Sequence, residues 1–248
     1  MNENQPAMQN EDEESRKETS PLPTRPSTAE PIIKTYAVML REIRSWGWWS
    51  LALGVMHLFA GFLSAPWGIV LLIVGLASFY YHEAAMFVVY GVILGWVGLA
   101  NMSGGETAWI IFGLLQLYLA FRVFRQFFQF RQAQEAYSDL LAEGILKSSP
   151  VSERAARTFP WIGGGVGALS LTVLIALLVS AIIMAAMNYE VPGFFNFAEN
   201  LCVRLGVIGL AMSLASLLSG HRYKFVAAIG LAASILTLVI EFALTLIF

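Results

Sequence analysis

Glu241 and Arg204 are the two side chains whose types and spacing best suit chemistry inside a membrane. Glu241 lies within the apolar run LTLVIEFALTLIF, and Arg204 lies within the apolar run before it. Both are equally distant from the turn at Arg222-Tyr223, so an antiparallel pair of helices would bring them to the same depth. An arginine–carboxylate pair lowers the cost of burying both charges. We expect a structural clamp between two helices, and the alternative is a proton or ion relay.

His57 and Gln116 form a second candidate contact. His57 lies in the middle of GVMHLFAG, and Gln116 lies in the middle of GLLQLYLA. Polar side chains at such positions commonly join neighbouring membrane helices by hydrogen bonds, so we predict a helix-packing contact between them. A haem or metal site needs a second strong ligand at the same depth, but His82 and His221 both fall at the expected membrane boundary. We therefore expect no cofactor and no metal.

The common catalytic signatures do not occur in this sequence. It has no G-x-S-x-G motif and no Walker loop. His82-Glu83 begins like a zinc-protease helix, but Met86 stands where that motif requires a second histidine. The two aspartates, Asp12 and Asp139, lie outside the apolar runs, and Cys202 is the single cysteine. We predict a protein that is not an enzyme.

Long apolar helices must position these residues. Of the 248 residues, 57% are hydrophobic and only 13% are charged, and the mean hydropathy is +0.66. This charge is too little to cover the surface of a soluble protein of the same size. Runs such as LSLTVLIALLVSAIIMAAM lack the alternation of a barrel strand. The predicted fold class is all-α, a polytopic α-helical membrane protein with the lipid bilayer as its surroundings.

We expect five successive regions with about seven membrane helices. Residues 1–31 form a disordered acidic tail, and residues 32–46 form an interfacial amphipathic helix. Residues 47–124 form a four-helix membrane unit, residues 125–159 form a basic helical linker that continues the fourth span, and residues 160–248 form a three-helix membrane unit. The expected spans are approximately 48–64, 67–81, 84–100, 108–124, 161–187, 201–220 and 225–248.

The first four spans are predicted to repeat one helical hairpin. The run GVMHLFAG, which begins at Gly54, matches GVILGWVG, which begins at Gly91. Further along, Ile73-Val74-Gly75-Leu76 matches Ile111-Phe112-Gly113-Leu114. Two spans per copy give parallel repeats, whereas many secondary transporters use inverted repeats.

The start of this repeat resembles a known family. The residues concerned are Trp46-Gly47-Trp48-Trp49, Leu53-Gly54-Val55, Pro66 and Ile73-Val74-Gly75-Leu76. Over residues 46–125 the chain resembles the HdeD-type multi-span membrane proteins of bacteria. The resemblance implies helical hairpins, a bacterial plasma membrane and a role in stress, because the family's namesake is associated with acid resistance. It implies no catalytic residues.

Lysine and arginine near the ends of the spans predict the orientation in the membrane. The segment before the first span, the stretch 122–159 after the fourth and the turn 221–224 after the sixth are all basic. The loops on the opposite side contain no lysine or arginine, namely residues 65–66, 101–107 and 188–200. We therefore place the N-terminus in the cytoplasm and the C-terminus outside.

The basic stretch 122–159 is interpreted as an ordinary inner loop that sets topology, and the alternative is a docking platform for a protein partner or for anionic lipid. Its basic residues follow the membrane boundary and do not resemble a nucleic-acid footprint. The predicted function is a non-enzymatic integral membrane protein of scaffold, stress-related or accessory-subunit type. The alternative is a small transporter or channel that uses Arg204 and Glu241.

Overall fold

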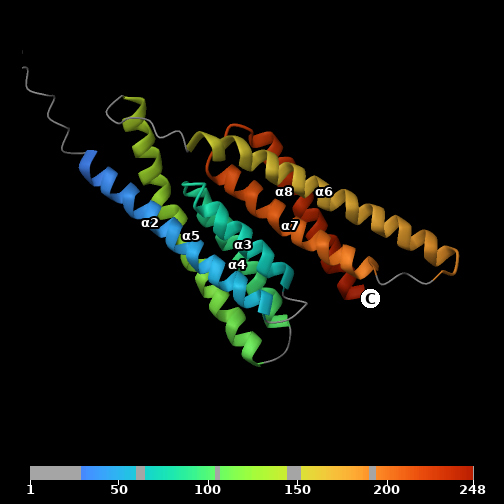
Figure 1. Ribbon diagram of the computed structural model, residues 1–248. Helices are drawn as coiled ribbons and strands as arrows, with labels where there is room; N and C mark the ends of the chain where they lie inside the picture. Colours follow the sequence, from blue (N-terminus) through green and yellow to red (C-terminus); the bar gives the residue numbers. More distant parts are fainter. Residues whose placement is uncertain (1–28, 60–64, 104–106, 144–151, 190–193, 248) are drawn as a thin grey trace, which may run out of the picture.

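The computed structural model describes residues 29–59, 65–103, 107–143, 152–189 and 194–247 (Figure 1). All regular secondary structure in these ranges is helical, which confirms the predicted all-α class. The first 28 residues lie outside the described ranges, and with them most of the predicted acidic tail. In chain order the helices are α2 (Ala29–Phe59), α3 (Ala65–Ser78), α4 (Ala85–Ser103), α5 (Thr107–Ala142), α6 (Ser152–Ala186), α7 (Phe194–Leu218) and α8 (Lys224–Ile247).

Five of the described helices, α4 to α8, are long and apolar enough to cross a membrane. The protein is therefore a multi-pass membrane protein. The helix α3 has 14 residues, or about 21 Å at 1.5 Å per residue, against roughly 30 Å of hydrocarbon. The helix α2 is longer, but charged residues occupy its first half. The count of seven spans stays a prediction.

Large apolar side chains cover much of the outer surface of the molecule. Phe59 is 87% exposed, Phe225 is 78% exposed and Phe121 is 70% exposed. Apolar surface of this extent would be unfavourable in water and is stable against lipid. The exposed side chains therefore support the same assignment as the helix lengths.

Two helices extend beyond their apolar segments without a break. The helix α2 runs continuously from Ala29, so the separate interfacial helix expected over residues 32–46 is the first half of a longer helix. The helix α5 continues through the polar stretch to Ala142, as the sequence predicted. No glycine or proline interrupts α5 between Arg122 and Ala142, and its alanine, glutamate, glutamine and arginine residues favour helix. Residues 144–151 lie outside the described ranges, and α6 begins at Ser152.

The first four helices form two hairpins, α2 with α3 and α4 with α5. Glycines bring the backbones together in both. A Cβ atom on Gly54 would lie 2.9 Å from the carbonyl oxygen of Gly68, and one on Gly98 would lie 2.9 Å from that of Gly113. In these two contacts, Gly98 of the second hairpin follows Gly54 of the first by 44 residues, and Gly113 follows Gly68 by 45 residues. The sequence motifs instead paired Gly54 with Gly91. That the hairpins are copies of one unit stays a prediction.

The last three helices pack closely around small residues. A Cβ atom on Gly167 would lie 2.5 Å from the carbonyl oxygen of Gly230 on α8, and one on Gly209 of α7 would lie 2.8 Å from the backbone of Gly167. A Cβ atom on Gly163 would lie 2.7 Å from the amide nitrogen of Ser213. The glycine-rich start of α6 is therefore a packing face, in which small residues let three backbones approach.

The helix α4 lies at the centre of the molecule and joins its two halves. It packs against α5 on one side and α7 on the other (Figure 1). Its residues from Ala85 to Val89 are fully buried. The core around α4 also includes Val207, Ala211 and Ala215 of α7. Small side chains on α7 thus let the second half approach the first.

Candidate functional site

The structure brings His57 and Gln116 together. The Gln116 side-chain nitrogen lies 3.2 Å from Nε2 of His57, and both side chains are buried. Asn101 of α4 donates from Nδ2 to Oε1 of Gln116 at 2.6 Å. One network thus joins α2, α4 and α5. The sequence places Asn101 in the loop after the third span and therefore predicts no helix contact for it.

These two hydrogen bonds determine the protonation of His57. Because Oε1 of Gln116 accepts from Asn101, the Gln116 amide nitrogen is the donor toward His57. We therefore assign Nε2 of His57 as an acceptor and place the proton of a neutral imidazole on Nδ1. The lone pair on Nε2 of His57, which would bind a metal, already accepts the hydrogen bond from Gln116. Beside it lies a cavity of about 170 Å³, lined by Met56, His57, Ala108, Trp109 and Phe112.

The neighbour of Glu241 in the structure is another acid. The Glu199 side chain on α7 lies close to the Glu241 side chain on α8, and Glu241 is only 5% exposed. Two carboxylates that lie close together repel each other when both are ionised. Arg204 is half-buried on α7 and has no ion pair within the described part of the chain. Glu199 lies five residues before Arg204, the predicted partner of Glu241, on the same helix.

A short polar seam continues from this acid pair into the three-helix unit. Ser170 of α6 donates to the backbone carbonyl of Cys202 at 2.9 Å and lies 3.3 Å from the hydroxyl oxygen of Thr237. Thr237 lies one turn before Glu241 on α8, and Ser170 and Thr237 are both fully buried. Hydrogen bonds between hydroxyl groups and backbone are common at helix contacts in membranes. The seam therefore links α6, α7 and α8 at the depth of the acid pair.

A buried polar contact joins the two halves of the molecule at the opposite end of α7 and α8. Nε2 of His221 lies 3.1 Å from a carboxylate oxygen of Glu83, and the two side chains are 5% and 3% exposed. Glu83 lies between α3 and α4, whereas His221 lies in the turn between α7 and α8. The Phe159 ring packs edge-on against both His221 and Tyr81. This contact holds loops that are 138 residues apart in the sequence.

Burial also changes the acidity of two groups around this junction. Burial raises the pKa of the Tyr36 hydroxyl above its usual value, and the charges of Tyr137 and Glu83 raise it further. Burial lowers the pKa of the His82 imidazole, and the charge of Arg44 lowers it further. At neutral pH, Tyr36 and His82 are therefore uncharged.

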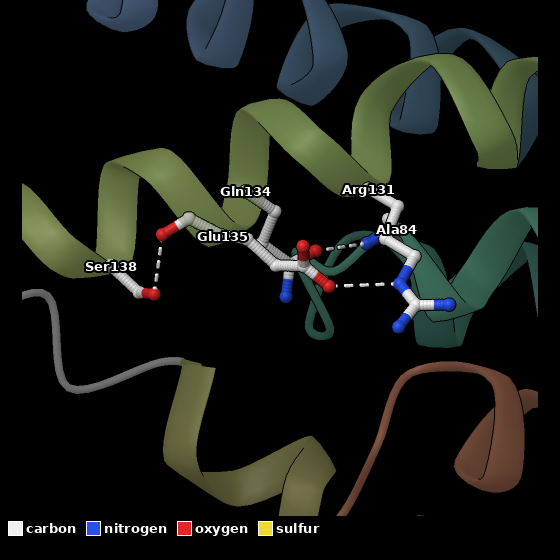
Figure 2. Close-up of polar contacts among 5 residues, drawn as sticks. All are labelled: Ala84, Arg131, Gln134, Glu135 and Ser138. Carbon is white, nitrogen blue, oxygen red and sulfur yellow. Dashed lines mark hydrogen bonds and ion pairs between the residues drawn. The ribbon is translucent and has the colours of Figure 1, made fainter.

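The N-terminal half of α2 and the C-terminal half of α5 pack side by side beyond the apolar segments. We call residues 29–45 and 125–142 the two-helix arm. The rings of Tyr36 and Tyr137 stack within it, with centroids 3.9 Å apart. At its base, Gln134 accepts a hydrogen bond from the backbone nitrogen of Ala84 at 2.8 Å, close to the ion pair of Arg131 with Glu135 (Figure 2). The arm is thus tied to the start of α4.

Sequence reasoning missed Glu199, Asn101 and the contact between Glu83 and His221. Glu199 and Asn101 were placed in loops, but α7 begins at Phe194 and α4 extends to Ser103. The signal available for Asn101 was its helical spacing from buried residues, because it follows Val97 and Gly98 by four and three residues on one face of α4. No three His, Cys, Asp or Glu side chains in the described ranges lie close enough to hold a metal ion.

Comparisons with protein-family models, curated proteins and solved structures found no match for this chain. The resemblance of residues 46–125 to the HdeD-type family therefore stays a prediction. The function has to be argued from the contacts, cavities and surfaces described above.

Proposed function

We propose that this chain is a non-enzymatic integral membrane protein of scaffold or accessory-subunit type, and that a protein partner docks on its two-helix arm. The observation that carries the proposal is the length of α5. Its 36 residues span about 54 Å at 1.5 Å per residue, against roughly 30 Å of hydrocarbon. A helix of this length perpendicular to the membrane would extend about 24 Å beyond the hydrocarbon. A helix used only to connect two spans would not need this length.

The arm presents one continuous exposed stripe along α5. Its members recur every three or four residues and therefore lie on one face of the helix. They are Arg125, Phe128, Gln132, Glu135 and Asp139, all of them exposed. The stripe combines both signs of charge with an exposed aromatic ring, 61% exposed at Phe128. We call it the arm stripe.

The composition of the arm stripe favours a protein over an anionic membrane surface. Acidic side chains occupy its outer part at Glu135 and Asp139, and these would be repelled by anionic lipid. Mixed charges around an aromatic residue are typical of the surfaces that proteins use for transient association. The opposite face of the arm is covered by its own packing, as the stacking of Tyr36 on Tyr137 illustrates. The partner expected is a protein surface with mixed charges.

Charge distribution supports an orientation with the arm in the cytoplasm. The arm and the turn at Arg222 carry lysine and arginine, whereas the loops at the far ends of the helices carry none. Positive residues are retained on the cytoplasmic side of membrane proteins. We place the N-terminus inside, the C-terminus outside and the protein in a plasma membrane.

Purification of the full chain from its native membrane in mild detergent, followed by mass spectrometry, tests the docking proposal. We expect a protein partner in a fixed ratio to this chain. The variant Arg125→Glu should reduce that ratio severalfold, because it reverses the positive charge of the arm stripe. The matched variant Arg222→Glu makes the same change at an exposed position outside the arm and should leave the ratio unchanged. Recovery of this chain alone, or only with its own copies, would refute the proposal.

The acid pair favours a second candidate function, a small transporter or channel. Acidic residues within membrane spans are costly and commonly mark a proton or ion pathway. The Glu199 and Glu241 side chains lie close together, and the Ser170–Thr237 seam continues from them. The sequence prediction used Arg204 with Glu241 for this role, and the proximity of Glu199 supports Glu199 with Glu241 as the proposed pair.

Proton flux into vesicles that contain the purified protein distinguishes this second candidate. A transporter should acidify a dye-loaded vesicle faster than lipid alone, and Glu241→Gln should abolish the difference because an amide cannot release a proton at neutral pH. The control Glu135→Gln, on the exposed arm, should keep the full flux. Equal rates for the unmodified protein and for protein-free vesicles would exclude a proton pathway.

A further inference from the structure

A cavity of about 230 Å³ lies between α2 and α5, where the apolar part of α5 meets the two-helix arm. Its wall includes Glu42, Trp46 and Trp49 of α2, and Leu115, Leu119 and Arg122 of α5. The apolar run of α5 ends at Phe121, directly before Arg122. The cavity therefore lies at the depth of the lipid headgroups, with its leucine side toward the hydrocarbon.

The charges of this cavity are separated onto its two walls. Arg122 provides a guanidinium group from α5, and Glu42 provides a carboxylate from α2. A guanidinium group binds phosphate oxygens in a bidentate geometry. A carboxylate accepts hydrogen bonds from an ammonium group. The cavity thus offers one group for an anion and one for a cation.

Glu42 is held in place by a chain of hydrogen bonds. Nε2 of Gln126 donates to Oε2 of Glu42 at 2.9 Å, and Nε1 of Trp46 donates to Oε1 of Gln126 at 2.6 Å. A carboxylate has about four acceptor positions, so this bond leaves acceptor capacity at Glu42. Groups fixed in this way lose little conformational freedom when a ligand binds. The cavity therefore has a preorganised acceptor next to a buried tryptophan.

The tryptophans and leucines fit the remainder of a lipid molecule. Trp49 is 60% exposed, and tryptophan prefers the boundary between headgroups and hydrocarbon. Its ring face also attracts an ammonium group. Leu115 is 51% exposed on the membrane side of the cavity, where an acyl chain would continue. Each part of the wall thus matches one part of an amphiphile.

We propose that this cavity binds the headgroup of a phospholipid that carries phosphoethanolamine. The phosphate would lie on Arg122, and the primary ammonium would donate to Glu42 and lie against Trp49. The acyl chains would run along Leu119 and Leu115. An anionic headgroup without an ammonium would leave Glu42 facing negative charge, and a choline headgroup has no N–H to donate to Glu42.

Native mass spectrometry of the intact protein, titrated with single lipids in detergent, tests this assignment. We expect phosphatidylethanolamine to bind more tightly than phosphatidylcholine or phosphatidylglycerol. Arg122→Gln should weaken its binding about tenfold, the loss expected for one charge-assisted hydrogen bond. Arg222→Gln removes the same charge from an exposed position outside the cavity and should leave binding unchanged. Glu42→Gln should remove the preference over phosphatidylcholine and keep phosphate binding.

Three results would overturn the assignment. The first is equal binding of all three lipids to the unmodified protein, a result that does not depend on the folding of any variant. The second is the same loss of binding in Arg122→Gln and Arg222→Gln, which would indicate a general effect of charge. The third is displacement of the lipid by soluble O-phosphoethanolamine at an equal concentration, which would assign the cavity to a soluble phosphate compound.

Discussion

Gln116 uses both ends of its amide group to connect helices. It accepts from Asn101 on α4 and donates to His57 on α2, while its own backbone belongs to α5. Other buried polar groups likewise connect separate elements, as Ser170 connects α6 with α7 and Glu83 connects the loop before α4 with the turn at His221. Polar residues in these places contribute to the specificity of helix packing.

Replacement of Gln116 by leucine should destabilise the protein. The change keeps the approximate size of the side chain but removes both hydrogen bonds and leaves the buried side chain of His57 without this donor. We expect a loss of about 1–2 kcal/mol in the free energy of unfolding. Unfolding in detergent, followed by circular dichroism, measures the loss.

The control for this change is Gln129→Leu, also on α5 but at an exposed position. It should alter the free energy of unfolding by less than about 0.5 kcal/mol. Equal losses in the two variants would contradict the network as a source of stability.

At the scale of single residues, the sequence predicts how deep a side chain lies in the membrane better than it predicts which neighbouring residue the side chain faces. His57 and Gln116 could be predicted to meet because polar side chains at mid-span are few. Glu241 could be placed at the depth of α7 residues near Arg204, but depth does not determine which side of α7 faces it. Glu199 and Arg204 are five residues apart, which separates them by about 140° around the helix. Only the packing of α7 on α8 decides that Glu199 faces Glu241.

At the scale of helices, glycine contacts determine how each hairpin packs. Gly98 and Gly113 place the backbones of α4 and α5 in contact, as Gly54 and Gly68 do for α2 and α3. The sequence predicted two similar hairpins but aligned them by their apolar motifs, with Gly54 on Gly91. The close contacts with Gly68 and Gly113 instead give Gly54 and Gly98 corresponding positions in the two hairpins. The position of the turn in each hairpin, and not the apolar motif, determines which residues of the two helices face one another. Turn position could not be read from the sequence while the span boundaries were loose.

Gly98→Ala should destabilise the α4–α5 hairpin, whereas Gly95→Ala should not. A Cβ atom at position 98 would lie 2.9 Å from the carbonyl oxygen of Gly113, so the helices must separate. We expect a loss of about 1–3 kcal/mol. At Gly95 the nearest atom is the Cβ of Ala120 at 3.8 Å, an ordinary contact.

Gly95→Ala should therefore be neutral or stabilise the protein by up to about 1 kcal/mol, because alanine favours helix over glycine. Thermal unfolding of the two variants in one detergent compares them directly. A larger loss at position 95 than at position 98 would be inconsistent with the close approach of α4 and α5.

At the scale of the whole molecule, α4, α7 and the contact of Glu83 with His221 hold the two halves together. The sequence predicted a four-helix unit and a three-helix unit but contained no signal for how they meet. Glu83 and His221 are 138 residues apart, and the sequence shows Glu83 only in an incomplete zinc-protease motif and His221 only as a boundary residue. Contacts of such separation depend on the completed fold.

A double-mutant cycle with Glu83→Ala and His221→Ala measures the strength of this contact. The pair is buried, so removal of one partner leaves a buried polar group without its hydrogen bond. We expect a coupling energy of about 1–3 kcal/mol in thermal or denaturant unfolding. The exposed pair of Arg131 with Glu135 provides the matched cycle, which should give less than about 1 kcal/mol. Equal coupling energies in both cycles would argue against the contact of Glu83 with His221 as a link between the two halves.

The most direct test of the docking proposal is site-specific photo-crosslinking in native membranes. A photoreactive residue at Gln132, on the arm stripe, should form a discrete crosslinked band with another protein. The same residue at Tyr223, which is 39% exposed in the turn between α7 and α8, should form none or far less. A discrete band at Gln132 supports a partner on the arm. Crosslinks only to lipid, or equal crosslinking at the two positions, would contradict it.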